Sequence, residues 1–267
     1  MNMKEQLSLP GTYPAKKKDG TLYYRCSFTY KNKHISLGSF DTAEASFDAY
    51  NEAIALVNSK KTIEDYSKKN VLTFEKWVVL INFRDNGIYF PNPIYIRKKF
   101  FSYYLDLHTE LKFSIDDLFY YASHKIMRRG GHFFVADYGM QTNILNRYGI
   151  KNYGIAGKDY DHKNEDPYDF RYENITVHNE YHGVSYTTHY GNPAYQAKIN
   201  LRGYYVVGYY ATAVEAAIAY NKAIDVAKKR GCKRNFKQNY TEGVSPSVYA
   251  DIYSKLKISS KIMEFTP

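Results

Sequence analysis

The chain reads Leu37-Gly38-Ser39-Phe40-Asp41-Thr42-Ala43 and then Ala49-Tyr50-Asn51-Glu52-Ala53, a stretch that decides the fold because it occurs twice. The second occurrence reads Val207-Gly208-Tyr209-Tyr210-Ala211-Thr212-Ala213 and then Ala219-Tyr220-Asn221-Lys222-Ala223. Every position is shifted by 170, without a gap. A repeat in fixed register indicates that one structural unit is present in two copies.

The residues around the first stretch predict three short strands and a helix. Lys16 to Gly20 form a basic turn with an Asp-Gly hairpin signal. Tyr24 to Phe28 alternate between large and polar side chains, as a half-buried strand does. A second turn, Lys31 to Lys33, leads to a strand from His34 to Leu37, and Thr42 caps the helix that follows. Three strands covered by one helix make a minimal two-layer module.

The second copy predicts the same module. It begins at Gly183-Val184, and its later strands are expected at Tyr195 to Ile199 and Tyr204 to Tyr210. Its helix is expected from about Thr212 to Lys229. The predicted fold class is therefore α+β, in which two small modules, each a three-stranded sheet plus a helix, flank a mixed central domain with helical and ββα-like parts.

Both copies resemble the AP2 DNA-binding domain. The resemblance rests on a glycine start, an aromatic-x-Ala-x-Ile strand, a Leu-Gly-x-Phe-Asp-Thr turn and an Ala-x-x-Ala-Tyr-x-x-Ala helix. In that family the sheet, and not the helix, lies in the major groove. The resemblance therefore implies that double-stranded DNA is the partner and that the outward side chains of the strands contact it.

Strand alternation selects the side chains that would face DNA. These are Arg25, Ser27, His34 and Ser36 in the first copy and Gln196, Lys198, Asn200 and Arg202 in the second. Arg and Lys suit guanine or phosphate, and Gln and Asn suit adenine. The alternative is that these residues only solvate an exposed sheet face. The chain departs from the family in having Tyr24 and Tyr195 where the family has Trp, and fewer Arg on the DNA face. Tyr204 and Val206 point outward on the third strand of the second copy, which is more typical of a surface packed on protein; in that alternative one copy is architectural.

The segment before the second copy, Asp161 to Ile175, is similar to the core of HNH nucleases. It has an Asp-His pair at its start, Asp169 and Arg171 in the following loop, and Asn174 near its end. The resemblance implies that His162 is the general base, that Asp161 binds a divalent metal such as Mg²⁺, and that Asn174 holds the loop that orients the histidine. HNH units fused to AP2 modules are typical of mobile-element nucleases.

The HNH resemblance weakens at the metal site. The family's helix would place its last metal ligand at Gly183, which has no side chain. His178, Asn179 and His182 lie nearby in the sequence, and a shifted ligand at Asn179 is conceivable. Because the connecting helix is shortened to Thr176–Tyr181, we expect the nuclease segment to be degenerate and to serve as a scaffold, with no cofactor. The alternative is an active nicking enzyme that depends on Mg²⁺.

The middle of the chain carries no catalytic motif. Trp77 to Ile81 reads as a buried strand or a short helix, Phe100 to Leu107 and Ile115 to Met127 read as helices, and His132 to Val135 as a strand. Basic side chains also gather here, including Arg128 and Arg129. They would either cross the phosphate backbone or solvate helix ends.

Bulk composition agrees with a nucleic-acid partner. The chain has 267 residues, a net charge of +10, a pI near 9.2 and 30 tyrosines. With only two cysteines, we expect neither a disulfide nor a Cys-based zinc site. We also expect a cytoplasmic protein of a bacterium or a phage-infected cell, without a membrane segment. The expected domains are 1–65, 71–145, 146–180 and 181–240, with a C-terminal tail at 241–267.

Three functions follow from these patterns. The first is a duplex DNA-binding protein with two AP2-like sheets. The second is an HNH-type homing or nicking endonuclease. The third is a phage-type inhibitor that binds a protein and reuses the fold, because fold alone does not fix function. The oligomeric state does not follow from the sequence.

Overall fold

The computed structural model describes residues 9–150, 154–178 and 180–266. The chain divides into two compact units, which are described one at a time. Among the described residues, the first unit comprises 9–127, 135–139 and 168–171. The second comprises 128–134, 140–150, 154–167, 172–178 and 180–266. Helices and several small sheets of two to four strands are mixed in both, which confirms the predicted α+β class.

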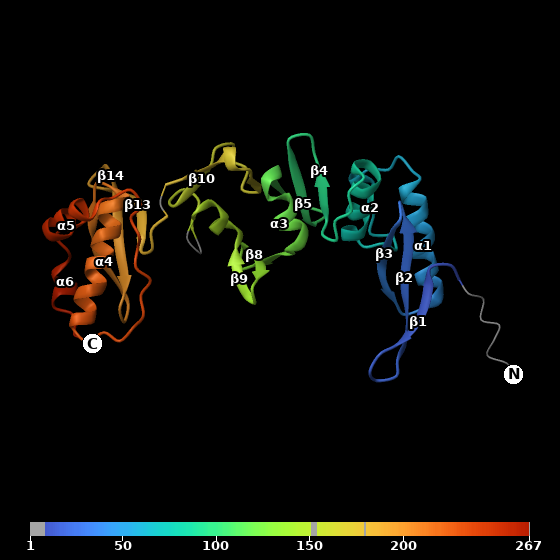
Figure 1. Cartoon of the computed structure of the whole chain (residues 1–267), viewed down its shortest axis with the longest axis horizontal. Helices are drawn as coiled ribbons and strands as arrows, with labels where there is room; N and C mark the ends of the chain where they lie inside the picture. Colours follow the sequence, from blue (N-terminus) through green and yellow to red (C-terminus); the bar gives the residue numbers. More distant parts are fainter. Residues whose placement is uncertain (1–8, 151–153, 179, 267) are drawn as a thin grey trace. The chain divides into compact units, whose positions relative to one another are not determined.

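The first unit begins with the predicted three-stranded module. Its sheet has the antiparallel order β1-β2-β3, and α1 covers one face (Figure 1). The hydroxyl of Thr42 accepts a hydrogen bond from the N–H of Ala45 at 3.1 Å and caps α1, as expected. The core packs Cys26, Ile35 and Leu37 of the sheet against the helix. The elements are β1 (Thr12–Lys16), β2 (Leu22–Tyr30), β3 (Lys33–Phe40) and α1 (Ala43–Val57).

The rest of the first unit corrects two predictions. The segment Phe100–Leu107, expected as a helix, contains strand β5, whereas Trp77–Ile81, expected as a strand or a short helix, lies inside helix α2. The expected helix Ile115–Met127 is reduced to a 3-10 turn and a short helix, after which strand β7 begins. The elements are η1 (Ile63–Asp65), α2 (Phe74–Asn86), β4 (Ile94–Ile96), β5 (Phe100–Asp106), β6 (Thr109–Ser114), η2 (Ile115–Asp117), α3 (Leu118–Ser123) and β11 (Asp169–Phe170), and the sheet order is β11-β6-β5-β4.

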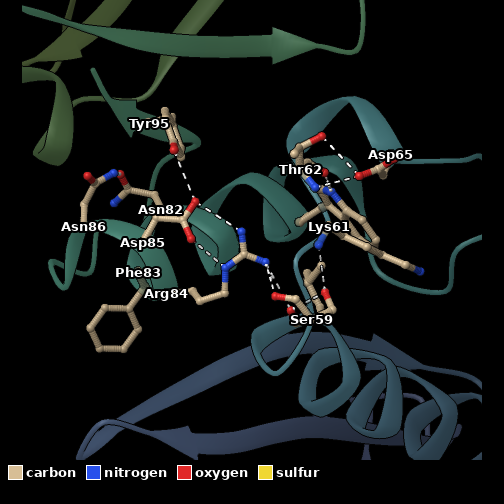
Figure 2. A network of polar contacts seen from close by, with 12 residues as sticks. Ser59, Lys61, Thr62, Asp65, Asn82, Phe83, Arg84, Asp85, Asn86 and Tyr95 are labelled. Carbon is tan, nitrogen blue, oxygen red and sulfur yellow. Dashed lines mark hydrogen bonds and ion pairs between the residues drawn. The ribbon is translucent and has the colours of Figure 1, made fainter. Parts of the chain in front are cut away.

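A polar network ties α2 to the end of α1 in this unit (Figure 2). The guanidinium of Arg84 donates to the backbone oxygen of Leu56 in the last turn of α1, at 3.4 Å, and to that of Ser59 just beyond the helix, at 3.0 Å. Its other side pairs with the carboxylate of Asp85 at 2.6 Å, and the hydroxyl of Tyr95 also donates to Asp85 at 3.2 Å. The hydrophobic cluster that holds Leu37 of the sheet also contains Trp77 of α2 and Tyr104 of β5, so α2 shares a core with the first module.

The second unit contains the second copy of the module. The sheet order is β13-β14-β15, and α4 covers one face (Figure 1). Thr212 caps α4 within a capping box that Glu215 completes. The elements are β13 (Val184–His189), β14 (Asn192–Asn200), β15 (Tyr204–Tyr210) and α4 (Ala213–Lys229).

Two small details show that the copies are the same structure. Each sheet has a β-bulge, which leaves Leu37 as the extra residue of β3 and Val207 as the extra residue of β15. Each module also begins at a glycine with a positive φ, +69° at Gly11 and +70° at Gly183. At both glycines an added Cβ would lie within 2.3 Å of a tyrosine ring of the covering helix, Tyr50 or Tyr220.

Residues 241–266, expected as part of a tail, pack in part on the core of the second unit. They form helices α5 and α6, and Ile262 and Phe265 are buried in the cluster that α4 and its sheet enclose. Apolar side chains at the end of the chain complete a core that a minimal module leaves open. The elements are α5 (Pro246–Lys255) and α6 (Ser260–Met263).

No helix in the described ranges has the length and apolar character to cross a membrane.

Short strands and 3-10 turns lie before the second module. The remaining elements are β7 (Ile126–Arg129), β8 (His132–Asp137), β9 (Met140–Asn143), η3 (Ile144–Tyr148), β10 (Tyr160–His162), η4 (Tyr172–Asn174) and β12 (Ile175–Val177).

Candidate nucleic-acid interface

The outer face of the first sheet, which α1 does not cover, presents polar side chains. Arg25 of β2 and His34 and Ser36 of β3 are exposed there, as predicted. Ser27 is a correction, because only 8% of its surface is exposed. It lies on the central strand, its N–H donates to the oxygen of Gly11 at 3.0 Å, and it stands opposite Ser36 on β3, so its short side chain is shielded.

Arg25 is held in place on this face. Its Nε and Nη2 donate to the hydroxyl of Tyr23 at 3.1 and 3.0 Å, and its guanidinium lies 5.7 Å from the centre of the Tyr23 ring. Tyr13 stands directly opposite Arg25 on β1 and is 54% exposed. Two of the five N–H donors of a guanidinium are thus used internally. A guanidinium held this way is pre-organised for a planar acceptor such as a guanine edge or a phosphate.

The outer face of the second sheet combines polar and aromatic groups. Gln196 donates from Nε2 to the hydroxyl of Tyr209 at 2.6 Å. The ring of Tyr209 stacks on His189, with 3.8 Å between the ring centres and 7° between the planes. Lys198 is exposed beside Val206, its partner on β15. This face therefore offers an amide, an ammonium and a stacked pair of rings.

Two predicted residues of the second copy are placed differently from expectation. Asn200 is half-buried, because its side-chain and backbone oxygens accept hydrogen bonds from Arg234 at 3.0 and 3.1 Å. Arg202 is exposed, but it lies in the turn after β14 and not on a strand, since β14 ends at Asn200. Tyr204 points outward as expected and is 79% exposed.

Arg128 and Arg129 close strand β7 and are both exposed. The guanidinium of Arg128 lies 5.9 Å from the ring centre of Phe133, within the second unit. The arginines are therefore displayed at a strand end, and not at a helix end as one interpretation of the sequence assumed. The helix-dipole explanation for their charge does not apply to this position.

The two ends of the HNH-like segment pair as a two-stranded sheet in the second unit. Strands β10 and β12 pair antiparallel, with Asp161 opposite Thr176 and His162 opposite Ile175. Asn174 is buried, and its Oδ1 accepts a hydrogen bond from the N–H of Asn164 at 3.0 Å. The side chain of Asn174 thus bonds to the loop after His162.

The carboxylate of Asp161 has hydrogen-bond partners within the protein. Its Oδ2 lies 2.6 Å from Nε2 of His178, and its Oδ1 accepts from the N–H of Gly157 at 3.0 Å. The hydrogen bond with His178 is the main reason why the pKa of the Asp161 carboxyl lies below its usual value. Both carboxylate oxygens therefore already have a partner.

The donor set for Mg²⁺ is incomplete in the described part of the chain. Mg²⁺ is bound through carboxylates and water in an octahedral arrangement, and no three His, Cys, Asp or Glu side chains among the described residues lie close enough to share an ion. Asn179, the predicted second ligand, lies outside the described residues. The described residues hold no helix at the predicted position 176–181; strand β12 occupies its start.

A basic segment was missed by the sequence analysis. Six cations occur between Lys228 and Lys237, all exposed, and no acidic residue stands between Asp225 and Glu242. The run of positive charges is visible in the sequence, but its residues were assigned to the end of the predicted helix and to the stretch after it. The structure places this segment at the end of β14, through Arg234.

Comparison with known proteins leaves the assignment to the geometry: no family model, no curated protein and no solved structure matches this chain.

Proposed function

We propose that the protein binds double-stranded DNA through the outer faces of its two matched sheets. The proposal is carried by one observation. In each unit, the sheet face opposite the helix is open and carries exposed basic and polar side chains, Arg25 and His34 in one copy and Lys198 in the other. A sheet that only needed a solvated face would not require a guanidinium held by a tyrosine hydroxyl.

The electrostatics support a nucleic-acid partner. The net charge of +10 attracts polyanions, and contacts to phosphates release counter-ions, so that affinity falls steeply with salt. Arg, Lys and Gln side chains on a strand ribbon can reach base edges in the major groove. The exposed lysines Lys16, Lys17 and Lys18 lie in the β1–β2 hairpin at one end of the first face and would contact the backbone.

The test is a fluorescence anisotropy titration of the full chain with a labelled random 30-base-pair duplex. The double variants Arg25→Ala/His34→Ala and Gln196→Ala/Lys198→Ala are compared with Lys68→Ala/Lys69→Ala. The control lysines are exposed and lie in the loop that bonds to Glu52 of α1, on the helix side of the first sheet.

Each outer-face variant should weaken binding by about tenfold or more, and the control by much less, because groove contacts are worth about 1–3 kcal/mol each. The control removes two formal charges and each outer-face variant removes one, so a control that weakens binding as much as or more than the outer-face variants would contradict the proposal, because affinity would then follow charge and not position.

A protein partner is the second candidate, and a specific observation favours it for the second sheet. Tyr204 is 79% exposed next to the outward Val206, and Tyr209 and His189 continue the same face. Exposed aromatic side chains are enriched at protein–protein contacts. If the full chain retains no duplex at 50 mM salt while Tyr204→Ala abolishes capture of a protein ligand, this second function replaces the first.

Nuclease activity is tested in a separate assay. Supercoiled plasmid is incubated with the protein and Mg²⁺, and nicking is scored for the wild type and for His162→Ala. Cleavage by the wild type that His162→Ala removes would assign the HNH-like segment a catalytic role. We expect no cleavage.

A further inference from the structure

A charged segment extends from Lys228 to Lys237 along the surface of the second unit. Its cations are all exposed, and no ion pair in the described part of the chain involves any of them. The segment lies between Asp225 and Glu242 with no acidic residue inside it. The cations are Lys228, Lys229, Arg230, Lys233, Arg234 and Lys237.

The backbone of this segment is fixed. After α4 the chain turns at Gly231, whose φ is +93°, and the N–H of Cys232 donates to the oxygen of Ala227 at 3.0 Å. Cys232 and Phe236 pack inward on the core of the second module. The apolar side chains of the segment therefore anchor it, and its cations remain on the outside.

A pair of asparagines secures the far end of the segment. Asn221 of α4 is buried, donates to the oxygen of Asn239 at 2.8 Å and accepts from its N–H at 2.8 Å. Asn239 in turn bonds to the backbone of His182 in both directions, at 2.7 and 3.0 Å. The cations are thus presented from a backbone held at both ends.

Arg234 fixes the position of the segment relative to the sheet. Its Nη1 donates to the backbone oxygen and Oδ1 of Asn200 at 3.1 and 3.0 Å, at the last residue of β14. Lys198, two residues earlier on the same strand, lies on the outer face. The basic segment therefore adjoins the end of the face to which we assign DNA.

The charge calls for an anionic partner. The dipole of α4 accounts for cations in its last turn, at Lys228 and Lys229, but not for Lys233 and Lys237 beyond the helix. Like charges fixed close together repel, and a partner with a regular row of anions relieves that repulsion. Duplex DNA carries one charge per about 1.7 Å of its axis. The only two apolar side chains within residues 228–237 other than glycine, Cys232 and Phe236, pack on the core, so the segment itself offers a protein partner no apolar anchor.

We propose that residues 228–237 form a phosphate-binding segment that contacts the DNA backbone beside the groove read by the β13–β15 sheet. This inference rests on the proposed function, since it adds a backbone contact to the same complex. Arg234 is a positioning residue, and Arg230, Lys233 and Lys237 are the phosphate contacts. Contacts of this kind raise affinity without adding sequence preference.

The experiment measures the slope of log affinity against log salt for the full chain on the labelled duplex. The variant Arg230→Gln/Lys233→Gln/Lys237→Gln is compared with Lys60→Gln/Lys68→Gln/Lys69→Gln, which removes the same charge from exposed lysines of the first unit. Each phosphate contact contributes about 0.9 to the slope. The segment variant should therefore lower the slope by about two to three, and the control by less than one.

A second variant separates charge from structure. Arg230→Lys/Lys233→Arg/Lys237→Arg keeps the charge and should keep the wild-type slope, and a lowered slope in this variant overturns the proposal. Equal slopes for the Gln variant and its control also overturn it, while the proposed function stands. If the wild type binds no duplex at 50 mM salt, the proposed function fails first, and this contact fails with it.

Discussion

Gly183 shows how a single residue fixes the module. Its φ is +70°, and an added Cβ would lie 2.2 Å from the ring of Tyr220 and 2.5 Å from the backbone oxygen of Lys198. We predict that Gly183→Ala lowers the free energy of unfolding by about 2 kcal/mol or more, because backbone strain and overlap add. Thermal unfolding monitored by calorimetry measures the change.

Gly191 supplies the control for this prediction. Its φ is also positive, +79°, but an added Cβ would meet no atom within 4 Å. Gly191→Ala should therefore cost only the strain of the backbone conformation, about 1 kcal/mol. Equal losses in both variants would show that the approach of Tyr220 contributes nothing.

Arg25 carries the residue-scale prediction for function. Arg25→Lys keeps the charge but loses the fork that Tyr23 holds, so it should weaken duplex binding by about tenfold, while His34→Lys should not weaken it. Tyr23→Phe removes the acceptor of both hydrogen bonds and should reproduce part of the loss. If Arg25→Lys leaves the affinity for duplex DNA unchanged, Arg25 contributes only its charge.

At the scale of the element, the repeat offers a matched pair of asparagines. Asn221 is buried and bonds to the backbone of Asn239, whereas Asn51, its counterpart on α1, is exposed. We predict that Asn221→Ala destabilises the protein by about 1–3 kcal/mol, because it leaves buried backbone groups of Asn239 unpaired. Asn51→Ala should change stability by less than about 0.5 kcal/mol. Urea unfolding of both variants checks the difference.

Helix α2 depends on Arg84 in a comparable way (Figure 2). Arg84→Ala removes the donors to the oxygens of Leu56 and Ser59 and leaves the carboxylate of Asp85 without its arginine. The expected loss of stability is about 1–3 kcal/mol, since hydrogen bonds to charged groups are the stronger ones. The exposed Lys60→Ala serves as the control, and a similar loss there would contradict the role of the network.

The predictability of each element follows its burial. The modules were predictable because one face of each sheet is buried and the other is open, so that residues alternate. Strand β5 was mistaken for a helix because Phe101 to Tyr104 are buried without interruption, which removes the alternation that marks a strand. The burial of Ser27 depends on neighbouring strands, and no local pattern reports it.

The candidate site was predictable to a similar extent. The outward direction of Arg25 and Lys198 followed from alternation, whereas the end of β14 before Arg202 depends on a turn whose length differs from that of the first copy. The hydrogen bond between Asp161 and His178 joins residues that are 17 positions apart, and the sequence does not predict that their side chains meet. The basic segment at 228–237 was visible as charge, but its link to Asn200 was not.

At the scale of the whole molecule, the account predicts strongly salt-dependent binding of the full chain. If both sheets and the basic segment contact phosphates, six or more contacts should give a slope of log affinity against log salt of about −5 or steeper. Titrations between 50 and 250 mM NaCl measure it. A slope shallower than about −2 would mean that the net charge of +10 is not used against DNA.

The most direct test of the outer-face assignment is site-specific photo-crosslinking to duplex DNA. A benzophenone amino acid is placed at Ser36 and at Val206, which lie on the outer faces, and at Asp48 of α1 and Asp251 of α5, which are exposed on the helices. The account predicts crosslinks to DNA from Ser36 and Val206 and none from the two helix positions. Crosslinks from the helices alone, with none from the strands, would contradict it.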